Sequence, residues 1–458
     1  MSALVPLVLF GWLPFVVVIF TLLPPRRAVI TAFLIGWLLL PVAKYDLPGF
    51  PDYGKGTATN LGVVLGVVLF DASRLSAMRW RWFDLCAAAF CFGPLLSSLS
   101  NGLGVYDGYA TSQAQFLTWG LPYLIGRAYF ADGPGLEELA RGLALGGLVY
   151  VPLCLWEIRM SPQLHYKVYG IAQHAFDQTM RGGGYRPMVF LYHGLALGLW
   201  MAVASVIAVT LWRRARHKTI AMFPPWMAAL GLVAVTVLCK SSGATLLMFM
   251  ALAGLYFTFS RATPKVLVAL AVLPFVFVPI RALNLWSGDE LVQWIYQYLP
   301  DRALSLGYRF DCENLLSEKA RQRWLLGWGG WGRSGLFIGE PDSAQPVVTD
   351  SLWILVFGRQ GALGLAGIVG MLTIPVIAFA RACPRNLWRH PRVAPAVALA
   401  MCLCMYMLDN LVNNMPNPFF VLIAGGLGAV RFAKPKRAAP HALPQRASAA
   451  VASDSPSS

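Results

Sequence analysis

Two arginines flank a run of glycines in the segment Arg181-Gly-Gly-Gly-Tyr-Arg186, just before a long apolar stretch. A guanidinium group is always charged in a protein and can bind a phosphate group through two parallel N–H donors. Charge at a membrane boundary is costly and tends to be kept for a purpose. We therefore predict that Arg186 binds the pyrophosphate of a lipid-linked substrate. For both Arg181 and Arg186 the alternative, an arginine that extends to lipid head groups, stays open.

Three further polar residues lie at the edges of apolar segments. His193 follows Arg186 by about two helical turns; it is a candidate for substrate binding, and the alternative is a histidine that only packs between helices. Lys240 and Ser241 lie in a short turn between two apolar segments. An ammonium group beside hydroxyls could hold a phosphate or a sugar there, and the alternative is an ordinary polar turn of a helical hairpin.

A third candidate arginine precedes a run of glycine and aromatic residues. Arg309 lies in Gly307-Tyr-Arg-Phe-Asp311, and the run follows at Leu325-Leu-Gly-Trp-Gly-Gly-Trp-Gly332. Glycine permits conformations that a regular helix does not use, so we expect a bent loop. Aromatic faces suit stacking on sugar rings, which makes Trp328 and Trp331 candidates for sugar binding. The alternative is an aromatic belt at the membrane interface.

Two carboxylates complete the candidate site. Asp350 opens the apolar segment after the longest hydrophilic stretch and is a candidate general base, or else a helix N-cap. Asp409 lies before the last apolar segment, where it could line a cavity, pair with an arginine or only form a polar turn. The cysteines and histidines show no metal-ligand spacing, and no Walker A or dinucleotide-binding motif occurs. We therefore expect no metal and no cofactor.

The composition indicates which elements must position these residues. The chain is 57% apolar and only 13% charged, whereas about 25% of the residues of a soluble domain are charged. The apolar residues form long runs, and a backbone in lipid must pair its own polar groups, so the runs predict membrane-spanning helices. The net charge of +16 does not indicate nucleic acid, because the basic residues form short clusters between apolar runs. The predicted partner is the lipid bilayer.

The predicted fold class is all-α, a polytopic transmembrane helical bundle of about 12 or 13 spans. We expect about thirteen apolar segments, near residues 4–23, 27–43, 58–71, 83–99, 115–131, 136–157, 187–211, 220–239, 243–260, 265–282, 350–380, 394–411 and 416–432.

Basic clusters mark every other connection between these segments, which predicts that those connections are cytoplasmic. The C-terminus then lies in the cytoplasm, and we expect the chain in an inner membrane. Thirteen spans would put the N-terminus outside, and twelve would put it inside. We expect four regions: transmembrane helices at 1–282, a periplasmic loop with interfacial helices (near 288–299 and 311–324) at 283–349, transmembrane helices at 350–432, and a disordered cytoplasmic tail at 433–458.

The order of these parts resembles the O-antigen ligase and O-antigen polymerase-like superfamily of bacterial membrane glycosyltransferases. In that family many helices precede one large periplasmic loop, and three spans follow it. The similarity covers roughly residues 140–432 and is carried by short motifs: Tyr185-Arg186-Pro with Tyr192-His193-Gly194, Ser241-Ser-Gly-Ala244, Arg309 followed by Leu325-Leu-Gly-Trp-Gly329, and Asp350-Ser-Leu-Trp353 with Gly361-Ala-Leu-Gly364.

Two positions depart from the family pattern. The family commonly has His-Asn where this chain has Thr349-Asp350, and often Ser-Arg where it has Lys240-Ser241-Ser242. The first departure affects the catalytic position: an aspartate serves as the base in place of histidine, or the ligase chemistry is altered or lost. The second departure, at Lys240-Ser241-Ser242, shifts the positive charge of the motif by about one residue along the chain.

The resemblance implies metal-independent, inverting transfer of a glycan from an undecaprenyl-pyrophosphate carrier to another lipid-linked glycan or to lipid A-core. Arg186 and Arg309 would hold the diphosphate, Asp350 would accept the proton of the acceptor hydroxyl, and Trp328 and Trp331 would bind sugars. A polymerase is slightly favoured over a ligase, because the histidine pattern is incomplete. The alternatives are a secondary transporter and a non-catalytic component that works with other polysaccharide assembly proteins.

Overall fold

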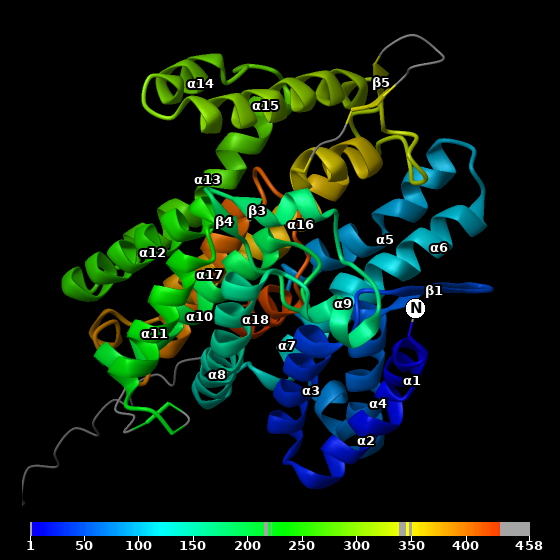
Figure 1. Cartoon of the computed structure of the whole chain (residues 1–458). Coiled ribbons are helices and arrows are strands. Elements are labelled where there is room, and N and C mark those ends of the chain that lie inside the picture. Colours follow the sequence, from blue (N-terminus) through cyan, green and yellow to red (C-terminus); the bar gives the residue numbers. More distant parts are fainter. Residues whose placement is uncertain (1, 215–218, 221, 339–344, 348–349, 431–458) are drawn as a thin grey trace, which may run out of the picture.

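The structure, a computed structural model, is a bundle of helices (Figure 1). It describes residues 2–214, 219–220, 222–338, 345–347 and 350–430. Thr349 and the predicted tail at 433–458 lie outside the described residues. The α-helices are α1 (Leu4–Phe10), α2 (Trp12–Leu22), α3 (Pro25–Leu39), α4 (Lys55–Ser76), α5 (Asp84–Ser100), α6 (Val105–Gln115), α7 (Leu121–Tyr129), α8 (Gly133–Met160), α9 (Leu164–Tyr169), α10 (Gly194–Arg214), α11 (Pro225–Leu238), α12 (Ser242–Arg261), α13 (Lys265–Ala282), α14 (Asp289–Tyr296), α15 (Pro300–Arg321), α16 (Leu352–Ala382), α17 (Ala394–Asp409) and α18 (Pro418–Ala429).

Short elements occupy the connections. A π-helical turn η1 (Phe116–Gly120) joins α6 to α7, and 3₁₀ turns form η2 (Phe176–Thr179) and η3 (Arg385–Leu387). Three antiparallel hairpins pair β1 (Lys44–Leu47) with β2 (Phe50–Gly54), β3 (Met180–Arg181) with β4 (Gly184–Tyr185), and β5 (Phe337–Ile338) with β6 (Gln345–Pro346). The sequence analysis did not predict these hairpins or α6.

The structure confirms a mostly helical fold with several helices that could span a membrane. Six of the described helices are long and apolar enough to span a membrane, namely α4, α8, α10, α12, α13 and α16. The bent pair of α1 and α2, with an angle of 48° between them, would make a seventh. α5, α11, α17 and α18 are apolar but shorter. Each of the thirteen predicted apolar segments contains a helix, whereas length and composition alone support about six spans.

The centre of the bundle consists of α10, α17 and α18 (Figure 1). Nearly every residue of these helices is buried, and their apolar residues occur on all faces, as expected for helices surrounded by other helices. α8 and α12 pack against α10, and α5 and α7 pack against α16 and α18. These central helices hold the connections at their ends in fixed positions.

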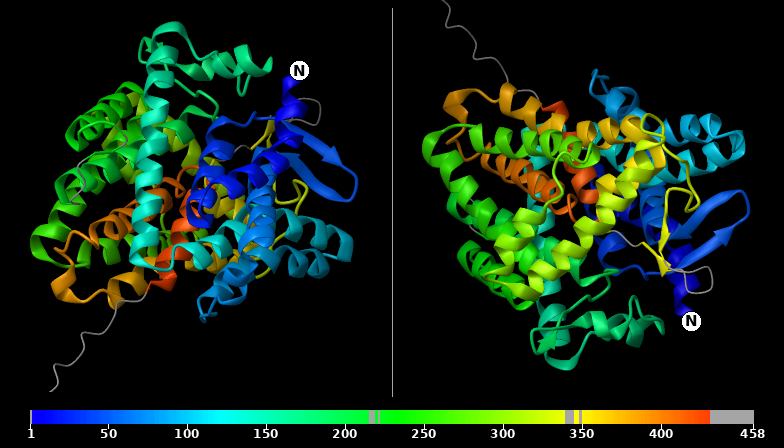
Figure 2. Two further views of the ribbon diagram at one scale, coloured as in Figure 1. Left: turned by 90° about the horizontal axis from the view of Figure 1, so that it is seen from below. Right: turned by 90° about the horizontal axis from the view of Figure 1, so that it is seen from above.

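α14 and α15 lie across one end of the bundle, outside it (Figures 1 and 2). They correspond to the predicted helices near 288–299 and 311–324, although α15 begins earlier, at Pro300, where proline suits the first turn. A buried ion pair fixes α15: Arg281 Nη2 on α13 lies 2.9 Å from Glu313 Oε2. The Ser351 hydroxyl, at the start of α16, donates to the other oxygen of Glu313.

α16 is broken at Gly361, whose φ is 61° and ψ −155°, and a non-helical segment from residues 324–329 fills the break. Ala362 N–H donates to Trp324 O at 2.7 Å, and Trp328 N–H donates to Gly358 O at 2.8 Å. In the interior of a membrane protein such backbone groups need partners within the protein. The glycine-aromatic run is therefore a bent loop, as predicted, and its backbone completes a spanning helix.

Replacement of Gly361 by alanine should strongly destabilise the protein. A Cβ atom there would lie 2.4 Å from the backbone carbon of Leu325, and the positive φ alone disfavours alanine by about 1–3 kcal/mol. We expect Gly361→Ala to lower the melting temperature of the purified protein in detergent, measured by intrinsic fluorescence.

The matched control is Gly231→Ala in α11, because a Cβ at Gly231 would meet no heavy atom within 4 Å. This variant should keep or slightly raise the melting temperature, since alanine favours helix by roughly 0.5–1 kcal/mol over glycine. Equal melting temperatures for the two variants would contradict a backbone contact at the α16 break.

Candidate functional site

One polar cavity of about 270 Å³ lies between α15 and the end of the bundle, where α10, α12 and α16 begin. We call it the basic cavity. Its lining consists of Gln178, Arg181, Arg186, His193, Leu195, Lys240, Ser241, Ser242, Gly243, Arg302, Ser305, Leu306, Arg309, Asp350, Val412 and Asn413. These residues come from five separate parts of the chain, which the antiparallel helices bring to the same end.

Arg186 is the most deeply buried cation of the basic cavity, with 3% of its surface exposed. Its backbone N–H donates to Thr179 O at 2.7 Å, and its Nη2 donates to Ser241 Oγ at 3.4 Å. Its Nε has no partner among the described residues. An unpaired buried donor is costly, so this guanidinium is prepared to bind an anion.

A buried glutamate holds the segment that carries Arg186. Glu157 on α8 is 1% exposed, and its Oε2 accepts hydrogen bonds from the N–H groups of Met188 and Val189, both at 2.8 Å. Its Oε1 accepts from Leu164 N–H at 3.0 Å. Val189 has a φ of 54°, which is unusual for a β-branched residue. The carboxylate therefore keeps a strained, non-helical backbone in place.

Two more side chains complete this support. Lys55 of α4 donates through Nζ to Phe190 O at 2.7 Å, and Gln173 Nε2 donates to Val189 O at 2.7 Å and Leu191 O at 3.1 Å. Most backbone groups of this irregular segment are thereby paired with buried side chains rather than with water. Arg186 thus has a rigid position at the base of the cavity.

Lys240 lies in a left-handed conformation, with a φ of 52°, between α11 and α12. Its Nζ donates to Gly182 O at 3.1 Å. A Cβ atom at Gly184 would lie 2.3 Å from this Nζ, so glycine at this position leaves room for the ammonium group where it lies. The lysine and Arg181 on β3 border the same side of the cavity.

α15 forms the opposite wall of the cavity. Arg302, Ser305, Leu306 and Arg309 line it, and their spacing of three, four and seven residues places them on one face of the helix. Arg309 Nη1 donates to Val412 O at 3.0 Å and to Asn413 Oδ1 at 3.1 Å. The connection between α17 and α18 therefore orients this guanidinium.

Asp350 faces Arg309. The distance between Arg309 Nη2 and Asp350 Oδ2 is 3.2 Å, and 48% of the Asp350 side chain is exposed. The N-cap residue of α16 is Ser351, and Leu352 N–H donates to the carbonyls of Asn410 and Asn413. Asp350 is therefore not the N-cap residue of α16 and lines the basic cavity; its role as a base stays a prediction.

His193 lies just before α10 and remains neutral at physiological pH. Its Nδ1 accepts a hydrogen bond from Leu195 N–H at 3.0 Å, so the neutral ring carries its hydrogen on Nε2. Burial and the positive charge of Arg186 lower the pKa of His193 from 6.5 to about 4. The ring can therefore donate a hydrogen bond to an anion without adding charge.

The basic cavity carries a strong excess of positive charge. Five cationic side chains and one carboxylate line it, a net charge of +4 with His193 neutral. Burial, followed by the nearby Arg181, lowers the pKa of Arg186 to about 10, so this side chain is still charged at neutral pH. Of the five cations, only Arg309 forms an ion pair within the described part of the chain.

The structure brings together seven of the ten site residues predicted from the sequence: Arg181, Arg186, His193, Lys240, Ser241, Arg309 and Asp350. Asp409 lies behind the cavity wall, where its Oδ1 accepts a hydrogen bond from Asn413 Nδ2 at 2.9 Å. Its connection to Arg309 therefore runs through Asn413.

Trp328 and Trp331 do not belong to the described lining of the basic cavity. Trp328 lies at the α16 break, with its Nε1 donating to Lys319 O at 2.9 Å, and Trp331 is 78% exposed. Trp328 thus belongs to the segment that fills the break, and Trp331 lies just after it. Their role in sugar binding stays a prediction.

The cavity also contains residues that the sequence analysis did not select, of which Gln178, Arg302, Ser305 and Asn413 are polar. Arg302 precedes Arg309 by seven residues and shares its face of α15, but both lie outside the helices predicted near 288–299 and 311–324. Gln178 and Asn413 had no signal in the sequence, since only the folded chain brings their connections to the cavity.

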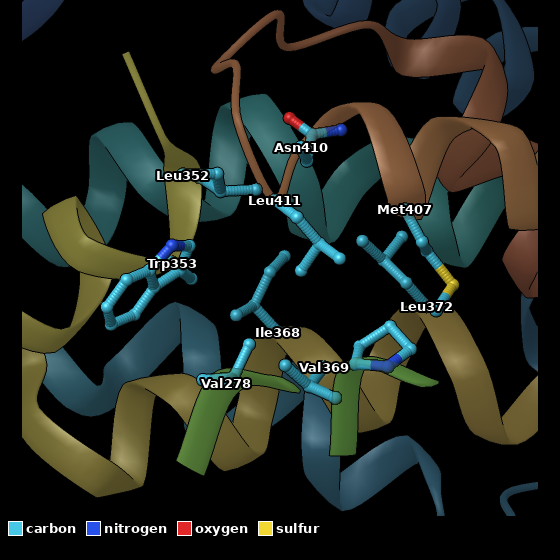
Figure 3. Close-up of a pocket in the computed structure, with 10 residues that line it drawn as sticks. Val278, Leu352, Trp353, Ile368, Val369, Leu372, Met407, Asn410 and Leu411 are labelled. Atoms are coloured by element: carbon cyan, nitrogen blue, oxygen red, sulfur yellow. The ribbon is translucent and has the colours of Figure 1, made fainter. Parts of the chain in front are cut away.

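A second, apolar pocket of about 40 Å³ lies between α13, α16 and α17 (Figure 3). Its lining includes Val278, Leu352, Ile368, Met407 and Leu411, whose aliphatic side chains converge on one space in Figure 3. Leu352 lies two residues after Asp350 and Leu411 directly before Val412, so the chain runs from the lining of the basic cavity into the lining of this pocket.

The chain matches no protein-family model and no curated protein. Its function therefore has to be argued from the chemistry of the basic cavity.

Removal of the buried cation should weaken anion binding. We expect Arg186→Gln to raise the Kd for inorganic pyrophosphate about tenfold or more, because a hydrogen bond to a charged group contributes ~1.5–3 kcal/mol. Isothermal titration calorimetry on the purified protein gives the Kd. Lys44→Gln removes an equal charge from an exposed hairpin outside the cavity lining and should bind like the wild type; equal weakening by both changes would mean that pyrophosphate responds only to the overall charge.

The lowered pKa of His193 predicts a pH-dependent stability. Between pH 6.5 and 4 the unfolded chain binds a proton at this histidine and the folded chain does not, so stability falls as the pH falls through this range. His193→Gln lacks this contribution. The stability of the wild type relative to that variant should therefore decrease on acidification, measured by thermal unfolding. A pH-independent difference between them would exclude a neutral, buried His193.

Proposed function

We propose that the protein is a membrane glycosyltransferase that moves or polymerises a glycan carried on undecaprenyl pyrophosphate, at the membrane face where the basic cavity opens. One observation carries this proposal: a single cavity contains Arg186, Arg309 and Asp350. These are the residues that the resemblance to O-antigen ligases and polymerases assigns to the diphosphate and to the base.

The cations suit a diphosphate leaving group. Arg186 offers an unpaired Nε deep in the cavity, and Arg309 is held by the α17–α18 connection. Positive groups fixed in advance stabilise the negative charge that develops on a departing oxygen. The reaction therefore requires neither a metal nor a general acid for its leaving group.

Asp350 is placed to accept the proton of the acceptor. In the proposed step the acceptor hydroxyl oxygen bonds to the anomeric carbon, on the face opposite the diphosphate, and inverts it. The bond between that carbon and the diphosphate oxygen breaks, and its electron pair stays on the diphosphate. The hydroxyl proton moves to Asp350, whose half-exposed carboxylate an incoming sugar can reach.

The basic connections support the proposed orientation. Arg213 and Arg214 end α10, Arg261 ends α12, and Arg381 lies in the last turn of α16, so these positive charges lie at the end opposite the basic cavity. By the positive-inside tendency we assign that end to the cytoplasm and the basic cavity to the periplasmic side of a bacterial inner membrane. Ser2 N–H donates to Tyr169 O, near the cavity end, which favours thirteen spans.

The alternatives receive less support. A secondary transporter has its site near the middle of the membrane, whereas the basic cavity lies at the ends of the spanning helices. A non-catalytic assembly component would not need the cavity that joins Arg186, Arg309 and Asp350. Between polymerase and ligase we favour the polymerase, as the sequence does, with other polysaccharide assembly proteins as its partners.

Loss of either proposed catalytic residue should abolish chain formation. We expect Arg309→Ala and Asp350→Asn each to reduce polymer synthesis about 10²–10³-fold, the range found when one electrostatic group is removed from an active site. The measurement is the length distribution of lipid-linked and surface glycans in a deletion strain that expresses each variant.

Immunoblots must show equal protein levels, and Lys44→Gln should restore normal glycan. A deletion strain that accumulates single repeat units on the lipid carrier would identify a polymerase, and one that accumulates long carrier-linked chains would identify a ligase. Wild-type glycan in both variants would refute the assigned roles.

A further inference from the structure

The positive charge of the basic cavity exceeds what the proposed donor supplies. The lining carries a net charge of +4, and a diphosphate linked at both ends carries about two negative charges, one for each phosphate group. Roughly two positive charges then remain without a counterion. Like charges repel in a partly buried site, so a further anion would stabilise the occupied cavity.

The reaction itself does not remove this excess. When the bond to the sugar breaks, the diphosphate gains one negative charge. The proton of the acceptor goes to Asp350, which loses its own negative charge at the same time. The positive excess is therefore the same before and after transfer, and the missing negative charge must belong to another part of the substrate.

One of the cations, Arg302, lies away from the residues that hold the diphosphate. Arg302 is on the same face of α15 as Arg309, two helical turns toward the start of the helix, a displacement of about 10 Å along the axis. This displacement is comparable with the length of a disaccharide. Arg302 is exposed and forms no ion pair with the described residues.

The groups between these two arginines suit a sugar. Ser305 lies on the same face of α15, and Gln178 borders the cavity from the segment before β3. A hydroxyl and an amide can each donate and accept hydrogen bonds, as sugar hydroxyls require. A guanidinium beyond them offers the two parallel donors that match a carboxylate.

From these observations we propose that the basic cavity selects an acidic glycan, with Arg302 binding a carboxylate on a sugar close to the diphosphate. This inference rests on the proposed function, and it adds a substrate class to it: uronic-acid-type sugars rather than neutral ones. Arg302 acts here as a specificity residue, separate from the groups that bind the leaving group.

The test compares two synthetic donors that differ in one group. Each is a short-chain polyprenyl diphosphate with a single sugar, glucose in one and glucuronic acid in the other. The purified full chain is placed in nanodiscs of zwitterionic lipid, and the Kd of each donor is measured by calorimetry. We expect the glucuronic acid donor to bind about tenfold more tightly, a difference of ~1.4 kcal/mol.

Arg302→Gln should bring the two Kd values close together by weakening only the acidic donor. Arg302→Lys keeps the charge without the fork geometry and should retain part of the preference. Lys44→Gln, with an equal loss of charge on an exposed hairpin, should keep the full preference. A preference that survives in Arg302→Gln would overturn the assignment of Arg302.

Inorganic pyrophosphate separates this inference from the proposed function. If pyrophosphate and both donors bind, and the two donors bind equally to the wild type, acidic selectivity is refuted while the proposed function stands. If pyrophosphate and both donors fail to bind, the proposed function fails as well. Preference for the acidic donor in the wild type together with its loss in Arg302→Gln supports the inference.

Discussion

A main chain that leaves the helical conformation among spanning helices must still pair its N–H and C=O groups, because lipid offers no partners. Two segments of this protein meet that requirement in different ways. Before α10, the carboxylate of Glu157, the amide of Gln173 and the ammonium of Lys55 bond to the backbone of residues 188–191. At the α16 break, the backbone of residues 324–329 supplies the partners directly. The positions of the charged residues depend on both solutions.

The first solution creates the basic cavity. Once Glu157 fixes the segment after Arg186, this arginine stays buried with an unpaired donor, although nearby positive charges oppose it. On the other wall, the ion pair of Arg281 with Glu313 and the bond from Ser351 join α13, α15 and the start of α16. Arg309 and Asp350 consequently keep their separation. A site with fixed charges has little reorganisation left to do when a charged ligand arrives.

Charge at the ends of apolar segments is the part of this design that the sequence reveals well. Spanning helices alternate in direction, so the charged residues at every second connection must meet at one end, and seven of ten predicted residues line one cavity there. The thirteen predicted apolar segments also contain helices, because a backbone in lipid has to pair its own N–H and C=O groups. Arg302 was missed because its charge belongs to a surface helix whose orientation the local sequence does not determine.

The tryptophans show where such reasoning stops. Glycines beside aromatic residues are expected both in a sugar-binding loop and in a segment that packs closely on another backbone. Which of the two applies depends on Gly361, which has a positive φ and lies close to Leu325. Nothing in the sequence around Trp328 indicates this contact. The hairpins and α6 were missed in a similar way, because their residues lack the strong apolar pattern of the spans.

The break in α16 has a consequence for protein synthesis. The residues that complete it, 324–329, precede α16 in the chain, so they leave the ribosome before Gly361 does. Ser97 of α5, which donates to Arg359 O at 2.8 Å, is made earlier still. When the two halves of α16 enter the bilayer, every described partner of the backbone groups opened at the Gly361 break already exists. The break can therefore be completed before the rest of the chain is translated.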